Sequence, residues 1–193
     1  MARSVSRRTL LGLAVAGLAG CVGGGPAATT TAEDPLTGDA TQLRDLALTS
    51  PAFDDGEAIP ERYGRRAEDL NPPLRIAGVP DDAASLVLVM DDPDAVEPAG
   101  TVWLHWLVWN IDPETTDIPA DWQPTDAVEG ENDFGDRGYG GPAPPDREHT
   151  YRFKLYAVDR TLDLPASASK ADVGEAMAGG VVARTQLEGT YAP

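Results

Sequence analysis

Hydrophobic residues along this chain fall mainly into short runs rich in β-branched and aromatic side chains, which is the pattern of β-strands. Five such runs cover residues 46–50, 85–90, 101–111, 150–159 and 181–192. Turn sequences rich in Gly, Pro, Asn and Asp separate them, and neither an internal repeat nor a second domain is visible. The pattern predicts a mainly β fold of the β-sandwich type.

One stretch carries the start and stop signals of a helix. Ser169 suits the capping position, Asp172 stands three residues further on, and residues 171–177 favour or tolerate a helix before Gly179 and Gly180 end it. We therefore expect one or two short peripheral helices beside the sheets, and this segment is the clear one.

The run 101–111 is apolar on both of its faces. A strand period of two divides it into Trp103, His105, Leu107 and Trp109 on one face and Leu104, Trp106, Val108 and Asn110 on the other. Such a strand is predicted to lie inside a sheet. His105 is then buried among aromatic side chains, where its ring nitrogens need hydrogen-bond partners.

The first 21 residues differ in character from the rest. Arg7 and Arg8 precede a short apolar run, residues 10–19, and the tetrapeptide Leu-Ala-Gly-Cys ends at Cys21. The arginine pair resembles a twin-arginine export signal, and the tetrapeptide resembles the box at which prokaryotic lipoproteins are cleaved and lipidated. We predict that residues 1–20 are a twin-arginine-type lipoprotein signal peptide and that a lipid on Cys21 anchors the exported protein to the outer face of the cytoplasmic membrane.

A flexible linker is predicted to follow. Residues 21–41 are rich in Gly, Ala, Thr and Pro without periodicity, so we place the folded domain at residues 42–193. Cys21 is the only cysteine of the chain, which excludes a disulfide or a cysteine-ligated metal within the domain.

The formal net charge of −17 narrows the choice of partners. An acidic surface repels phosphate backbones, so nucleic acid is not an expected partner. Lys154 and Lys170 are the only lysines, and strong acidity with few lysines is typical of surfaces that work in high salt. We expect a halophilic source.

Candidate chemistry gathers in two segments. Asp91, Asp92 and Asp94 directly follow the predicted strand 85–90, so their carboxylates are expected at one sheet edge. His149 and Tyr151 follow the Gly- and Pro-rich residues 138–145, and strand parity places them with Phe153 on one face.

These features together would make a small anion site. The N–H groups of Gly140 and Gly141 and the two imidazoles are suitable donors, and a nearby aspartate would orient an imidazole and favour its protonated form. Each feature alone also has a purely structural interpretation: a hydrogen-bonded core histidine, an acidic turn, or a surface loop.

In combination and order, four segments resemble the phosphatidylethanolamine-binding protein family, also called Raf kinase inhibitor-like proteins, and specifically its bacterial and archaeal branch. They are Asp-Asp-Pro-Asp-Ala at 91–95, 103–111, Gly-Tyr-Gly-Gly-Pro-Ala-Pro-Pro at 138–145, and 149–159. The likeness covers about residues 43–193. It implies a Greek-key β-sandwich with a pocket at one end for phosphate, a phosphoryl headgroup or a carboxylate, without metal or cofactor.

Carried over to this chain, the resemblance implies a ligand-binding set of Asp92, Asp94, Trp103, His105, Gly141, Pro142, His149 and Tyr151. The chain departs from the family pattern beside this set, which bears on the identity of the ligand. Val96 stands where Pro is usual, Thr150 where Arg is common, Gly180 where many relatives have His, and residues 146–148 replace a Gly-containing loop.

We therefore predict a non-enzymatic, lipid-anchored binding module for a small anion. One alternative is a protein-interaction module that inhibits a protease or kinase, although a fold does not confer inhibition. A metal-dependent hydrolase is a weaker alternative, because two His and two Asp are present without a tight ligand spacing. The domain has no serine-nucleophile, phosphate-loop or dinucleotide motif.

Overall fold

The computed structural model describes Leu36 and residues 38–193. The predicted signal peptide with Arg7 and Arg8, the predicted lipidation site Cys21, and most of the predicted linker lie outside the described residues. Within the described part, no helix combines the length and apolar character needed to cross a membrane.

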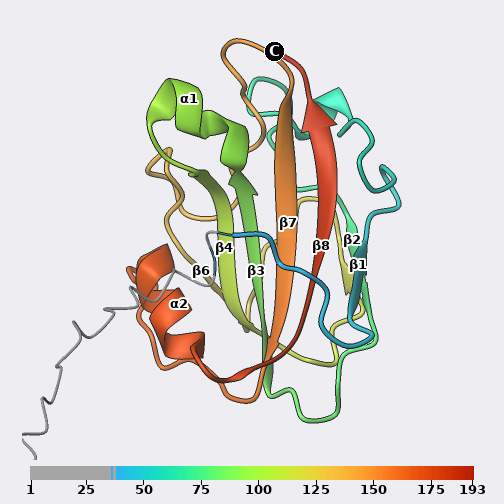
Figure 1. The fold of residues 1–193 in the computed structure, drawn as a ribbon, viewed down its shortest axis with the longest axis vertical. Helices are drawn as coiled ribbons and strands as arrows, with labels where there is room; N and C mark the ends of the chain where they lie inside the picture. Colours follow the sequence, from blue (N-terminus) through green and yellow to red (C-terminus); the bar gives the residue numbers. More distant parts are fainter. Residues whose placement is uncertain (1–35, 37) are drawn as a thin grey trace, which may run out of the picture. The chain divides into compact units, whose positions relative to one another are not determined.

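Two antiparallel sheets form the fold (Figure 1). The larger sheet has the order β6 (Val128–Glu129), β4 (Trp103–Ile111), β3 (Ser85–Asp92), β7 (His149–Val158) and β8 (Val181–Tyr191). The smaller sheet has the order β1 (Ala47–Thr49), β2 (Leu74–Ala77) and β5 (Asp117–Ile118). All five predicted strand runs correspond to strands, whereas β2, β5 and β6, of two to four residues each, were not predicted.

Short helices lie beside the sheets. The 3₁₀ turns η1 (Glu61–Tyr63) and η2 (Pro93–Ala95) and the single-turn α1 (Val96–Ala99) precede or follow strands, and α2 (Lys170–Met177) is the longest. The Ser169 side chain accepts the Asp172 N–H while the Asp172 side chain accepts the Ser169 N–H, which is the predicted capping box. The prediction of a mainly β fold with short peripheral helices is confirmed.

Each face of the larger sheet has its own hydrophobic core. Leu88, Met90 and Phe153 pack on one face together with Leu48 and Ile76 of the smaller sheet, which makes the sandwich. The opposite face is covered by residues of α2 and of the N-terminal segment; its core includes Val87, Val89, Tyr156, Val173, Met177 and Leu36. Because both faces are covered, every residue of β3 is buried.

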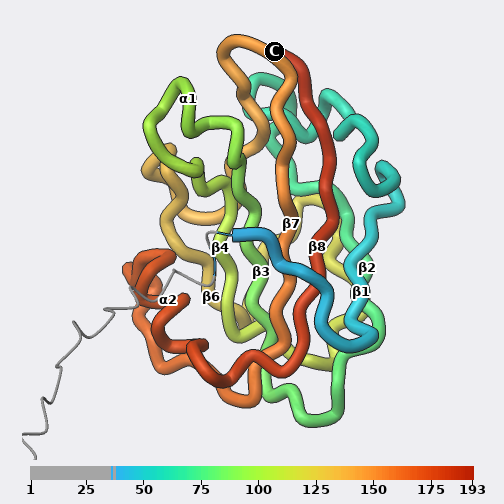
Figure 2. Tube along the Cα trace, viewed as in Figure 1, coloured from blue at the N-terminus to red at the C-terminus, as the bar shows by residue number. Residues whose placement is uncertain are grey.

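The segment before residue 42 is part of this second core. Leu36 is 0% exposed, and its carbonyl and that of Gly38 accept hydrogen bonds from Lys154 Nζ. Asp39 pairs with Arg152 at 2.8 Å. In Figure 2 this part of the chain runs across the larger sheet toward β1. The folded part therefore begins before residue 42, where the sequence pattern places its start.

A β-bulge interrupts β4 at His105. Met90 of β3 pairs with Trp106 and Asp91 pairs with Leu104, so His105 is the extra residue. Trp106 packs between the sheets and the His105 ring lies against Tyr151, whereas Leu104, Leu107 and Trp109 pack on the other face. The prediction that His105 shares a face with Leu107 and Trp109 is wrong, because a period of two does not hold across a bulge.

Candidate functional site

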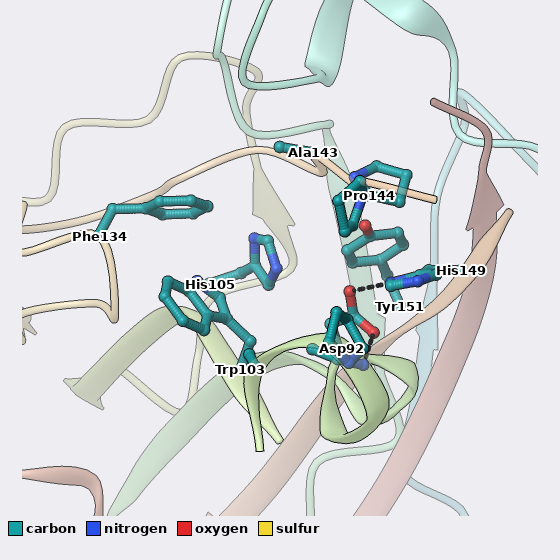
Figure 3. Close-up of a pocket in the computed structure, with 12 residues that line it drawn as sticks. Asp92, Trp103, His105, Phe134, Ala143, Pro144, His149 and Tyr151 are labelled. Atoms are coloured by element: carbon teal, nitrogen blue, oxygen red, sulfur yellow. Dashed lines mark hydrogen bonds and ion pairs between the residues drawn. The ribbon is translucent and has the colours of Figure 1, made fainter. Parts of the chain in front are cut away.

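A cavity of about 260 Å³ lies where β3 ends and β4 and β7 begin. Its lining is mainly apolar and consists of Asp92, Ala95, Pro98, Ala99, Trp103, His105, Phe134, Ala143, Pro144, Pro145, His149 and Tyr151. Figure 3 shows Trp103, His105 and Phe134 on one side of this space and His149, Tyr151 and Asp92 on the other. Three strand ends, the η2–α1 segment and the loop before β7 thus contribute to one site.

Asp92 orients His149. As the last residue of β3, Asp92 caps η2 by accepting the Ala95 N–H on Oδ1 at 3.1 Å, and Pro93 stiffens this turn. Its Oδ2 lies 2.7 Å from His149 Nδ1. On the other side of the ring, His149 Nε2 lies 2.9 Å from Asp146 Oδ1. Burial lowers the pKa of His149, but the hydrogen bond and charge of Asp92, and then those of Asp146, outweigh burial and raise it.

His105 is held in a different state. Its Nδ1 lies 2.7 Å from the Gly140 carbonyl, and because a carbonyl only accepts, Nδ1 carries the proton. Burial lowers the pKa of His105, and the hydrogen bond to Gly140 and the charge of Asp92 offset this only in part. The cavity thus combines a neutral imidazole with one that is readily protonated.

Two polar atoms of the cavity wall lack partners. Among the described residues, Trp103 Nε1 and the buried Tyr151 hydroxyl form no hydrogen bond of normal distance and angle, although the hydroxyl lies near the Asp92 carboxylate and the Ala143 backbone. Burial, and then the charge of Asp92, raise the pKa of Tyr151, so the hydroxyl keeps its proton. A buried donor without an acceptor costs free energy. Both groups are suited to bind an acceptor atom placed in the cavity.

The three aspartates do not gather at one edge, which corrects the expectation from the sequence. Asp91 and Asp92 belong to β3 itself, and the Asp91 carboxylate binds Arg152 and Lys154 on the opposite face. Asp94 does not line the cavity: it accepts the Thr150 N–H at 2.8 Å and pairs with Arg147 at the rim. Of the three, only Asp92 lines the cavity.

Gly141 and Pro142 also lie outside the lining. The Gly141 N–H donates to Asp69 Oδ1 at 2.7 Å and the Gly140 N–H donates to the His105 carbonyl, so neither faces a ligand as predicted. A Cβ on Gly141 would lie 2.3 Å from the Tyr63 carbonyl oxygen. The Gly-Gly pair is therefore needed for close packing of two loops, which a glycine-rich motif indicates as readily as an anion site.

The structure adds cavity residues that the sequence analysis missed. Phe134 contacts Trp103 and His105 edge to face, with ring centroids 5.4 Å apart in both pairs. Pro98, Ala99 and Pro144 add apolar wall. Such loop residues carry no local pattern, and only the motif Pro-Ala-Pro-Pro could have pointed to Pro144. In the part of the chain that the structure describes, no group of three or more His, Cys, Asp or Glu side chains is placed to hold a metal.

The fold and the site define a small β-sandwich protein with a histidine- and aspartate-containing cavity at one end of its larger sheet. The family model described as phosphatidylethanolamine-binding protein matches residues 49–192, and the chain belongs to this family. The resemblance seen in the sequence motifs is thereby confirmed.

Similar proteins come from archaea and bacteria. A UPF0098 protein of Methanothermobacter thermautotrophicus is 46% identical over 151 residues, which cover 76% of this chain and 98% of that protein. The crystal structure of CT736 from Chlamydia trachomatis, described as a homologue of phosphatidylethanolamine-binding protein, has a TM-score of 0.72 and 39% identity over 77% of this chain and 98% of that one. Escherichia coli YbcL, described as a member of the mammalian family, has a TM-score of 0.70 and 32% identity over 76% of this chain and 97% of its own.

Proposed function

We propose that this protein is a non-enzymatic binding protein for a small oxyanion, either a carboxylate, a phosphate or a phosphoryl headgroup. The observation that carries this proposal is the pair of unpartnered donors, Tyr151 O–H and Trp103 Nε1–H, in one cavity with His149. The acceptor oxygens of a bound oxyanion could satisfy such donors, and the charge of protonated His149 would favour an anion over a neutral acceptor.

The wall of the cavity supports a ligand with a small apolar part. Ala95, Ala99 and Pro144 form an apolar part of the wall, and charge-assisted hydrogen bonds are stronger in apolar surroundings than in bulk solvent. The volume of about 260 Å³ fits a headgroup-sized molecule rather than a polymer.

The cavity lining supports the proposal of binding without catalysis. No Ser, Thr or Cys stands among the residues that line the described cavity, so no such side chain there could act as a nucleophile. His105 is held neutral by burial, with its Nδ1–H already donated to Gly140. These features favour recognition over bond cleavage.

Calorimetric titration of the full chain with phosphate, O-phosphorylethanolamine and acetate at about pH 6, where His149 is protonated, tests the proposal. Tyr151→Phe removes one unpartnered hydroxyl, so we expect weaker binding, by about tenfold, without loss of fold. Tyr139→Phe is the matched control, because the Tyr139 hydroxyl donates to the Tyr63 carbonyl outside the cavity. Equal affinities for the parent and Tyr151→Phe would contradict the proposed site, and no binding of any of the three ligands would contradict the function.

The N-terminal sequence supports a second part of the proposal, that the binding domain is exported and held to the membrane by a lipid on Cys21. The supporting observation is the order of Arg7-Arg8, apolar run and Leu-Ala-Gly-Cys. Cys21→Ser is expected to move the protein from the membrane fraction to the soluble fraction. Unchanged membrane association of this variant would contradict the anchor.

A further inference from the structure

Both ring N–H groups of His149 donate hydrogen bonds to carboxylates, and the two carboxylates differ in exposure. Asp92, bound to Nδ1, has a side chain that is 5% exposed, whereas Asp146, bound to Nε2, has a side chain that is 48% exposed. Asp92 is also fixed by its hydrogen bond from Ala95. The contact with Asp92 is therefore part of the buried framework, and the contact with Asp146 is one that solvent and solutes can reach.

The loop that carries Asp146 is held at the rim of the cavity by ion pairs. Arg147 lies 3.2 Å from Asp94 Oδ1 and 3.1 Å from Glu97 Oε2, so it bridges from the loop to η2 and α1. The arginine is 46% exposed and Glu97 is 79% exposed. Exposed pairs of this kind are screened by solvent and each contribute little, so the loop can move away at modest cost.

Asp146 thus occupies the one ring N–H of His149 that is not bound to the buried Asp92. Pro145, the residue before it, lines the cavity, and Asp146 itself does not. With Asp146 in place, a molecule in the cavity can reach Tyr151 and Trp103, but both N–H groups of His149 are already donated. Removing Asp146 would add one charge-assisted donor and remove one negative charge at the rim.

We infer that Asp146 is an internal competing ligand: its carboxylate occupies His149 Nε2 and must be displaced before an external oxyanion is bound by that nitrogen. The inference rests on the proposed function and deepens it, because it makes the affinity of the site depend on a residue of the rim loop. The group that Asp146 stands in for is an oxyanion such as a carboxylate or phosphate.

The test compares two variants of the full chain in titrations with inorganic phosphate at about pH 6 and fixed salt. Asp146→Ala frees His149 Nε2. Glu148→Ala removes the same charge from the same loop, but Glu148 is exposed and the His149 ring binds Asp92 and Asp146 instead of it. We expect Asp146→Ala to bind phosphate about tenfold more tightly than the parent and Glu148→Ala to change the affinity by less than about twofold.

A second readout reports the contact itself. The ¹⁵N shift of His149 Nε2 should change when phosphate is added to Asp146→Ala, because the nitrogen gains a new acceptor. Asp146→Asn keeps a neutral acceptor at the same position and is expected to bind phosphate with intermediate affinity. This variant also serves if Asp146→Ala fails to fold.

The outcomes separate this inference from the function on which it rests. Phosphate binding by Asp146→Ala and not by the parent, or a tenfold gain confined to Asp146→Ala, supports both. Phosphate binding with equal affinity in parent and Asp146→Ala, or an equal gain in Asp146→Ala and Glu148→Ala, overturns the inference and leaves the proposed function standing. Absence of phosphate binding in all variants overturns the inference, whereas the proposed function falls only if acetate and O-phosphorylethanolamine also fail to bind the parent.

Discussion

Asp91 and Asp92 are consecutive residues of β3 whose carboxylates act on opposite faces of the larger sheet. Asp91 Oδ1 lies 2.8 Å from Arg152 Nε and its Oδ2 lies 2.6 Å from Lys154 Nζ, beneath the N-terminal segment. Asp92 Oδ2 lies 2.7 Å from His149 Nδ1 in the cavity. The alternation of side chains along a strand explains the division. One aspartate thus stabilises the docking of a chain segment, and the other orients an imidazole.

The two histidines are expected to titrate on opposite sides of the ordinary histidine pKa. Asp92 and Asp146 raise the pKa of His149 against the effect of burial, and burial lowers the pKa of His105. Because the chain has two histidines, heteronuclear NMR of the parent and of His105→Gln assigns both. Titration of both rings together near about pH 6.5 would contradict the structure.

Stability should depend on pH in a direction that these two shifts determine. The raised pKa of His149 stabilises the fold in full below about pH 6.5, and this contribution is lost as the pH rises through the folded-state pKa. The lowered pKa of His105 makes stability fall as the pH drops below about 6.5. The urea midpoint of the parent should therefore be highest at about pH 6.5 and decline at both lower and higher pH. Asp92→Asn, which keeps an acceptor for Ala95, should flatten the decline above about pH 6.5; an unchanged decline would show that His149 is not its cause.

Replacing Lys154 should destabilise the docking of the N-terminal segment. Lys154 is 0% exposed and binds the carbonyls of Leu36 and Gly38 as well as Asp91. In Lys154→Met these carbonyls lose their donor while Asp91 keeps Arg152, so we expect a loss of about 3 kcal/mol in the free energy of unfolding, measured in urea. Lys170→Met is the control, with an expected change below about 0.5 kcal/mol. Equal effects of the two substitutions would mean that the segment is not held in this way.

Gly141 should not tolerate a side chain. A Cβ there would lie 2.3 Å from the Tyr63 carbonyl oxygen and 2.6 Å from the Arg65 nitrogen, and backbone atoms cannot move aside as a flexible side chain can. We expect Gly141→Ala to lower the free energy of unfolding by about 2 kcal/mol, and Gly38→Ala, whose added Cβ meets nothing within 4 Å, to change it little. Full stability of Gly141→Ala would show that the two loops are not packed this closely.

The capping box of α2 should make a measurable contribution. Ser169→Ala removes the acceptor for the Asp172 N–H and is expected to cost about 1 kcal/mol in chemical unfolding. Ser167→Ala, an exposed position before the helix, is the control. Identical midpoints for the two variants would mean that the cap contributes nothing.

The strands and α2 were predictable because their signals are local. Period-two apolar runs and a Ser-x-x-Asp cap act within a few residues, so they can be recognised without tertiary information. The same holds for Asp92, His105, His149 and Tyr151, which the sequence motifs bring into one set and which line one cavity in the structure.

Other features depend on which distant residues meet, and no local pattern records that. The bulge at His105 follows from the register of β3 against β4, which moved the imidazole away from the face that simple alternation predicts. Asp69 accepts the Gly141 N–H across 72 residues of sequence, and Arg147, which neighbours Asp146, pairs with Asp94 and Glu97 about 50 residues away. The sequence by itself determined five of the eight strands in the described part, the α2 helix, the family and the chemical inventory of the site. Only the tertiary structure decided which donors of that inventory are already used, because hydrogen bonds between distant residues are set by packing and register rather than by neighbours along the chain.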